Sequence, residues 1–129
     1  MDYKEITGID DFPEPKQFLF DILGKNGFSA DFIQITIDQL KGYKLVPDPD
    51  ITALPMGCYI RYMPIYNFDL KAGGFVINQE SHVITLGGDG KKWKVNAKKS
   101  YVFIKKKTKI QKNKFRIMLE RMLKERELA

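Results

Sequence analysis

The first sixty residues contain two segments with apolar side chains at helical spacing. In the first, four apolar residues recur at i, i+1, i+4 and i+5: Phe18, Leu19, Ile22 and Leu23. Pro13 and Pro15 precede them, at positions where the first turn of a helix tolerates proline, and Asp11 can cap that turn. Gly24 follows them and indicates the end of the helix. The pattern predicts a short amphipathic helix.

The second segment, residues 29–41, is bounded like a helix. Ser29 can accept a hydrogen bond from a backbone N–H of the first turn, Asp31 stands where the helix dipole favours an acid, and Gly42 ends the segment. The competing signal is an alternation of three β-branched residues, typical of a strand: Ile33, Ile35 and Ile37. Both boundary signals favour the helix, and the strand remains the alternative.

Beyond residue 54 the pattern changes to short runs of aromatic and β-branched residues between turn signals. Five such runs predict strands: Cys58–Met63, Phe75–Asn78, His82–Leu86, Lys92–Asn96 and Tyr101–Lys105. The breaks between them carry Pro64, Gly73-Gly74, Asn78–Ser81 and Gly87–Gly90, and the last two are short enough for antiparallel hairpins. Because closure removes exposed strand edges, the runs predict a small five-stranded antiparallel β-barrel, SH3-like or OB-like in size.

The chain ends in an amphipathic helix predicted from about Gln111 to Glu127. Its apolar stripe supplies the candidate partner-binding residues: Phe115, Met118, Leu119 and Met122. A helix so charged would fray alone, so we expect the stripe to dock on the barrel, the N-terminal helices or another chain. The sequence therefore predicts one compact α+β unit. It comprises an acidic arm and helical segment (1–50), a small barrel (51–107) and a basic amphipathic helix (108–129).

Charge is distributed unevenly along the 129 residues. Residues 1–50 carry five lysines and ten acidic residues, a net of −5, whereas residues 51–129 have a net of +11. Either the two parts attract each other, or the C-terminal part meets nucleic acid, an acidic protein surface or a membrane. The chain has a single cysteine, an acidic N-terminus and no long apolar run. These features predict an intracellular, non-secreted protein without a transmembrane segment.

The main candidate for chemistry is a lysine-rich stretch that also contains Trp93, Tyr101 and Phe103. Eight of its lysines form the candidate anion-binding set: Lys91, Lys92, Lys94, Lys98, Lys99, Lys105, Lys106 and Lys107. Lysines beside aromatic rings are typical of nucleic-acid binders without sequence preference. In the alternative interpretation the rings are core and the lysines only solvate outer strand faces, since Trp93 alternates with Lys92 and Lys94. Lysine in place of arginine argues against base-specific recognition.

Catalytic constellations are missing from the sequence. His82 is the single histidine, which excludes a multi-histidine metal site, and a nucleophilic dyad would need it beside Cys58 or a serine. His82 is predicted within a strand, and Cys58 is better explained as a small buried side chain. The segment Gly87–Lys92 lacks the spacing of a phosphate-binding loop and is better explained as a hairpin turn. We therefore expect no enzyme activity, metal or cofactor.

Five segments of the strand region carry a resemblance to a known group of proteins. They are Gly57–Tyr62, Gly73–Ile77, Val83–Leu86, Trp93–Val95 and Val102–Lys106. Together, over about residues 54–106, they resemble a small β-rich domain of uncharacterised proteins from large eukaryotic double-stranded DNA viruses. The pattern includes no catalytic residue, so it assigns no active site to this chain. The resemblance implies a viral protein, packaged in the virion as a minor structural component or bound to its DNA.

Two expectations of function follow. The first is a non-enzymatic interaction protein that contacts other protein subunits, as a minor structural or assembly component of a large DNA virus. Such a protein would reside in the host cytoplasm or nucleus, or in the virion. The alternative is a basic module that contacts nucleic-acid phosphates through the region Lys91–Lys114.

Overall fold

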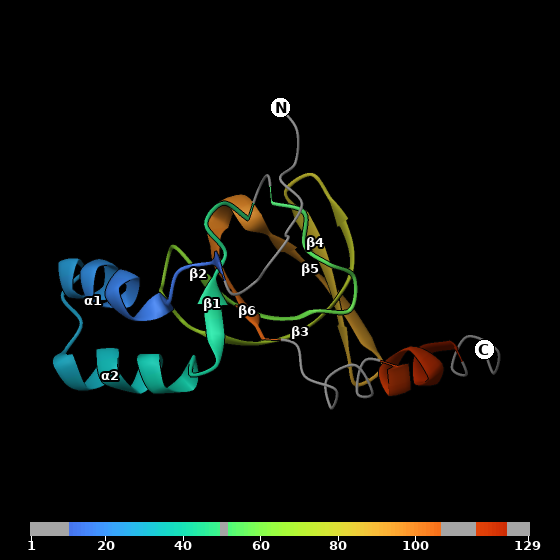
Figure 1. The fold of residues 1–129 in the computed structure, drawn as a ribbon, viewed down its shortest axis with the longest axis horizontal. Helices are drawn as coiled ribbons and strands as arrows, with labels where there is room; N and C mark the ends of the chain where they lie inside the picture. Colours follow the sequence, from blue (N-terminus) through green and yellow to red (C-terminus); the bar gives the residue numbers. More distant parts are fainter. Residues whose placement is uncertain (1–10, 50–51, 107–115, 124–129) are drawn as a thin grey trace.

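The computed structural model describes residues 11–49, 52–106 and 116–123. Helices α1 (Pro15–Lys25) and α2 (Ala30–Gln39) come first. Six strands follow: β1 (Tyr43–Leu45), β2 (Tyr59–Pro64), β3 (Lys71–Glu80), β4 (Val83–Gly88), β5 (Lys91–Asn96) and β6 (Ser100–Lys105). A 3-10 turn, η2 (Ala97–Lys99), joins β5 to β6, and residues 116–123 form a C-terminal helix. The fold is α+β, as predicted (Figure 1).

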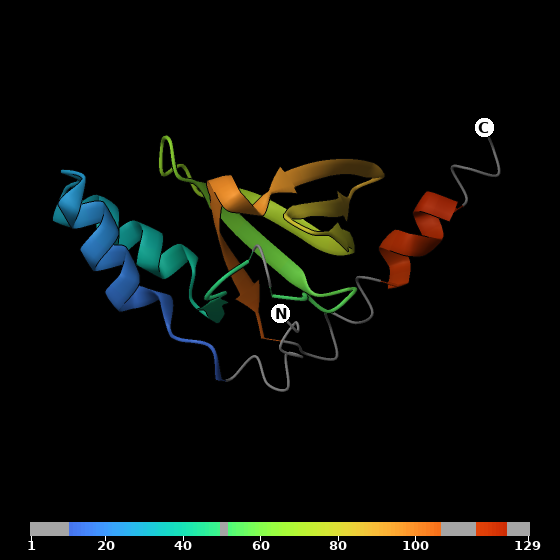
Figure 2. The ribbon, with the colours of Figure 1, turned by 90° about the horizontal axis from the view of Figure 1, so that it is seen from above.

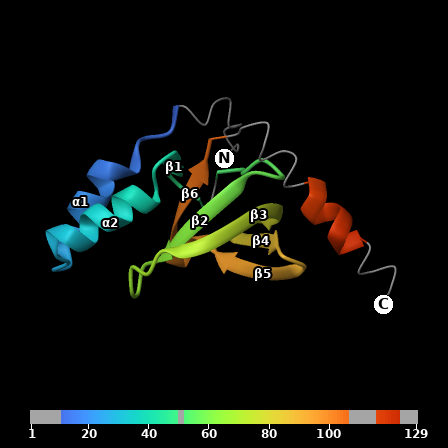
Figure 3. The same ribbon diagram turned by 90° about the horizontal axis from the view of Figure 1, so that it is seen from below.

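The strands form one antiparallel sheet in the order β1-β6-β2-β3-β4-β5 (Figure 3). Strands β2 to β5 are joined as successive neighbours, and η2 then carries the chain back so that β6 pairs with β2 and β1. The β4–β5 hairpin turns through Asp89 and Gly90, whose φ angles of 50° and 75° are those of the tight turn that suits twisted strands. The sheet is open, with β1 and β5 at its edges, so the predicted closed five-stranded barrel is not confirmed.

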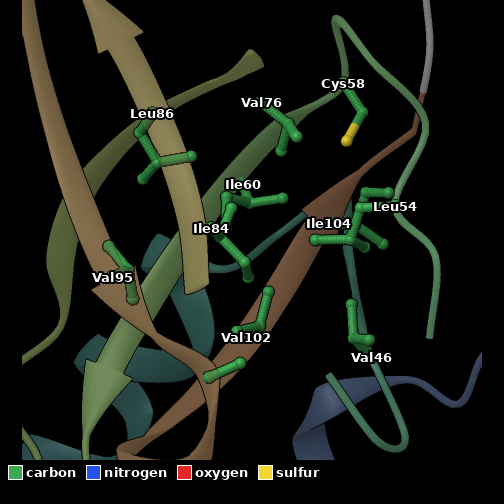
Figure 4. Close-up of a cluster of buried hydrophobic side chains, with 11 residues drawn as sticks. Val46, Leu54, Cys58, Ile60, Val76, Ile84, Leu86, Val95, Val102 and Ile104 are labelled. Carbon is green, nitrogen blue, oxygen red and sulfur yellow. The ribbon is translucent and has the colours of Figure 1, made fainter. Parts of the chain in front are cut away.

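One face of the sheet carries the larger hydrophobic cluster, which we call the inner cluster (Figure 4). Its buried members are Val46, Leu54, Cys58, Ile60, Val76, Ile84, Leu86, Val95, Ala97, Val102 and Ile104. Alternate positions of the strands supply most of them, as expected for a sheet with one face in the core. Cys58 is 1% exposed and its sulfur points into this cluster, which confirms the interpretation of Cys58 as a buried small side chain.

Helices α1 and α2 cover the opposite face, at the end of the sheet formed by β1, β6 and β2 (Figures 1 and 2). The buried side chains between the two layers are Leu19, Leu23, Ile33, Leu40, Tyr43, Met63 and Phe103. Strand β6 is therefore buried on both faces. Three consecutive apolar residues at its centre are fully buried for this reason: Val102, Phe103 and Ile104.

The boundaries of the helices test the capping predictions. The Ser29 hydroxyl oxygen accepts a hydrogen bond from the Phe32 N–H at 3.2 Å, which confirms the cap and the helical assignment of residues 30–39. The prediction for Asp11 is wrong, because α1 begins at Pro15 and follows Glu14 without a side-chain cap. Pro15 fixes the backbone angle at the helix start and lacks an N–H, so one of the donors that a capping side chain would satisfy is absent. Helix α1 also continues past Gly24 to Lys25.

Candidate nucleic-acid interface

The structure divides the predicted lysine set into two groups. Five exposed members lie on β5 and η2: Lys91, Lys92, Lys94, Lys98 and Lys99. We call these five the β5–η2 lysine strip. Lys105 ends strand β6 and Lys106 follows it, and β2, β3 and β4 separate β6 from β5 in the sheet. Lys105 instead lies beside β1, with its Nζ 5.9 Å from the centroid of the Tyr43 ring. Lys107 lies outside the described residues.

The β5–η2 lysine strip borders an open edge of the sheet. Strand β5 pairs only with β4, and its side chains alternate between the two faces. Trp93 and Val95 turn toward the inner cluster, and Lys92 and Lys94 turn away from it, as predicted. Within residues 11–49, 52–106 and 116–123 the structure contains two ion pairs, Lys44 with Glu14 and Lys71 with Asp69. Neither involves the strip, so no described carboxylate neutralises its ammonium groups.

A groove with a volume of about 660 Å³ opens beside Lys91, at the β4–β5 turn. Four aromatic side chains line it: Tyr59, Tyr62, Phe75 and Trp93. Five glycines leave room between these rings: Gly73, Gly74, Gly87, Gly88 and Gly90. Among the described residues, the cationic side chains that border it are Lys71, Lys91 and Arg121, and the single acid is Asp89. We call this site the aromatic groove.

Glycines position the indole of Trp93 in the aromatic groove. A Cβ on Gly74 would lie 2.9 Å from the indole Cη2, and a Cβ on Gly88 would lie 3.7 Å from the same atom. The ring therefore rests against strand backbone that carries no side chain. Trp93 is half-buried: it packs on the inner cluster, as predicted, and also lines the groove. The sequence pattern predicts Gly73-Gly74 only as a break between strands, and no motif in it indicates the groove.

Tyr59 and Phe75 are held by contacts within the site. The Tyr59 hydroxyl donates a hydrogen bond to the Ala72 carbonyl at 3.0 Å, and burial raises the pKa of this phenol. Phe75 meets the Tyr59 ring edge-on, with the centroids 5.0 Å apart. Lys71 donates a hydrogen bond to Asp69 at 3.0 Å, and this contact raises the pKa of its ammonium group. Lys71 is thus already paired with an acid, whereas Lys91 is not.

The C-terminal helix (residues 116–123) supplies the remaining wall of the aromatic groove. Met118 is 6% exposed. If Gly87 carried a Cβ, that atom would lie 3.3 Å from the Met118 Sδ. The helix therefore packs on β4 at a position that has no side chain. Of the predicted partner-binding stripe, Leu119 and Met122 are half-buried and Phe115 lies outside the described residues. The stripe therefore packs, at least through Met118, on the sheet of its own chain.

The candidate catalytic residues are not assembled into a site. His82 lies in the β3–β4 turn, so its predicted place within a strand is wrong, and Cys58 lies in the inner cluster. Among the described residues, no group of three or more histidine, cysteine, aspartate or glutamate side chains is placed to hold a metal ion. No helix in the same part of the chain is long and apolar enough to cross a membrane.

Comparison of the chain with known proteins found no matching family model, no matching curated protein and no matching solved structure. The resemblance to viral β-rich domains therefore stays a prediction.

Proposed function

We propose that the protein is a non-enzymatic binding module that holds nucleic acid by its phosphates along the β5–η2 lysine strip. One observation carries the proposal: five exposed lysines follow an edge strand and the turn after it, without an ion-pair partner among the described residues. Phosphate contacts supply most of the affinity of non-specific nucleic-acid binding, because each neutralised phosphate releases condensed counterions.

Protection of the sheet edge explains only part of this pattern. Lysines on an edge strand discourage pairing with the edge of another sheet, which accounts for Lys92 and Lys94. Lys98 and Lys99 lie on a 3-10 turn and present no strand edge, so they need another explanation. A row of cations that continues from strand to turn can contact successive phosphates of one backbone. Lysine is a point charge, so the contacts fix the strand without reading its sequence.

Reversing two charges of the strip tests the proposal. The double variant Lys92→Glu/Lys94→Glu should bind a labelled oligonucleotide about 50-fold or more weakly at ~50 mM salt, because two phosphate contacts become repulsions. Fluorescence anisotropy measures the affinity. The matched control is Lys16→Glu/Lys41→Glu, which changes the net charge equally at exposed positions of the helical layer. Equal losses of affinity in both double variants would show that binding depends only on net charge, which would contradict the proposal.

A second candidate function, contacts with other protein subunits, is favoured by the outer surface of the helical layer. Three large apolar side chains are exposed there: Phe20 (40%), Phe32 (37%) and Ile35 (56%). Phe32 and Ile35 lie one helical turn apart on α2, and an exposed apolar patch is typical of an interaction surface. A minor structural component of a virus, as the resemblance implies, would use such a surface. Light scattering across protein concentrations tests this candidate: an oligomer that Ile35→Lys dissociates supports it, and a monomer throughout argues against it.

For the fold, we propose that the sheet is an opened version of an SH3-like barrel. Strands β2 to β5 form a meander, and η2 returns the chain so that β6 pairs with β2. A meander supports the SH3-like over the OB-like alternative, because an OB-fold is built as a Greek key. Strand β1 adds a further strand at one edge.

A further inference from the structure

The aromatic groove and the β5–η2 lysine strip are continuous, because Lys91 belongs to both. Lys91 and Trp93 share one face of β5, and Lys92 and Lys94 share the other. Since β5 is an edge strand, the lysines of both faces border the same open edge. A chain of phosphates lying along this edge would pass Lys91, which lines the groove.

We infer that the aromatic groove takes up unpaired bases, so that the protein selects single-stranded over double-stranded nucleic acid. The inference rests on the proposed phosphate binding by the strip. Exposed bases stack on aromatic side chains, and this stacking adds to the affinity with little dependence on sequence. The bases of a duplex are already stacked on one another and paired, so they are not free to enter such a groove.

Trp93 and Tyr59 are held in place by contacts within the protein. The indole of Trp93 lies against Gly74 and Gly88, and Tyr59 is fixed by its hydrogen bond to the Ala72 carbonyl. A site whose side chains are already immobilised loses less conformational entropy on binding than a flexible one. The groove is therefore suited to flat, rigid ligand groups such as nucleobases.

The charges around the groove favour an anionic ligand. Lys91 and Arg121 are cationic and Lys71 is paired with Asp69. Asp89 is the single acid among the described residues that line the groove. An aromatic site for a cationic ligand would place acids, rather than lysine and arginine, around the rings. A nucleotide can stack its base on the rings and pair its phosphate with the cations, whereas a proline-rich peptide can contact only the rings.

Trp93 is the only tryptophan of the chain, so its fluorescence reports directly on the groove. The unmodified protein is titrated with an oligothymidylate of about twelve nucleotides, within the site sizes of known single-strand binders, and with an abasic strand of equal length. We expect saturable quenching by the oligothymidylate and none by the abasic strand. The oligothymidylate should also bind about ten-fold more tightly than the abasic strand in an anisotropy competition, as one stacked base would give.

The outcomes separate this inference from the proposed function. If neither strand binds, the proposed phosphate binding fails. If both bind equally and Trp93 fluorescence does not change, phosphate binding stands and the groove inference is overturned. Quenching by a proline-rich peptide but by no oligonucleotide also overturns it. As a second readout, Trp93→Phe should keep most of the preference for the oligothymidylate over the abasic strand, and Trp93→Ala, checked for folding by circular dichroism, should lose it.

Discussion

Replacing Gly73 with alanine is expected to lower the free energy of unfolding by about 3–5 kcal/mol, at the severe end for a single substitution. Gly73 has φ = +80°, a left-handed conformation that costs an L-residue about 1–2 kcal/mol. Its Cβ would also lie 1.8 Å from the Ile60 carbonyl oxygen and 2.8 Å from the Arg61 Cα. Both atoms belong to the backbone of β2, where the register with β3 shifts, so neither moves without breaking the pairing of the two strands.

Gly27→Ala is the matched control for this clash. Gly27 has nearly the same backbone angle, φ = +83°, but no atom lies within 4 Å of its Cβ position. Its substitution should therefore cost only the backbone strain, about 1–2 kcal/mol. Urea unfolding followed by circular dichroism measures both variants. Equal losses of unfolding free energy in the two variants would contradict the close approach of β3 to β2 at Gly73.

Truncation of Phe103 to alanine should destabilise the protein by about 3–5 kcal/mol. Phe103 is fully buried at the centre of β6, in the layer between the sheet and the helices α1 and α2. Its ring lies 6.4 Å from that of Phe18, centroid to centroid. Removing it leaves a cavity that side chains anchored on two different layers do not readily fill, so the loss includes a cavity term.

Phe20→Ala provides the comparison for Phe103. It removes the same atoms from a side chain that is 40% exposed on α1, and should cost less than about 1.5 kcal/mol. Thermal unfolding distinguishes the two variants by their midpoints, because a change of about 1 kcal/mol shifts the midpoint of a domain of this size by several degrees. Similar midpoints would contradict the placement of the helices over β6.

The sequence predicted most of the fold because its local signals were consistent. Each of the five runs between turn signals overlaps a strand, and the boundary signals of residues 29–41 outweighed the alternation of its isoleucines. Strand β1 was missed because three residues are too few to show a period. Strand β3 is longer than predicted, since Gly73-Gly74 lies inside it. There the glycines serve a close approach of two strands and not a turn.

Barrel closure and the grouping of the site residues depend on topology, which local patterns do not contain. Lys105 follows Lys99 closely in sequence, but β6 returns between β1 and β2 and carries Lys105 away from β5. The aromatic groove unites Tyr62 of β2, Gly74 of β3 and Trp93 of β5, and no spacing along the chain predicts that convergence. The interpretation of Trp93 as core was correct for its packing on the inner cluster and missed its place in the groove.

The salt dependence of affinity tests phosphate binding by the β5–η2 lysine strip most directly. Each phosphate contact with a single strand contributes about −0.7 to the slope of the logarithm of the binding constant against that of the salt concentration. Five lysines therefore predict a slope of about −3.5 for the unmodified protein and a single-stranded oligonucleotide. A slope close to zero, or no binding at ~50 mM salt, would contradict the proposed function.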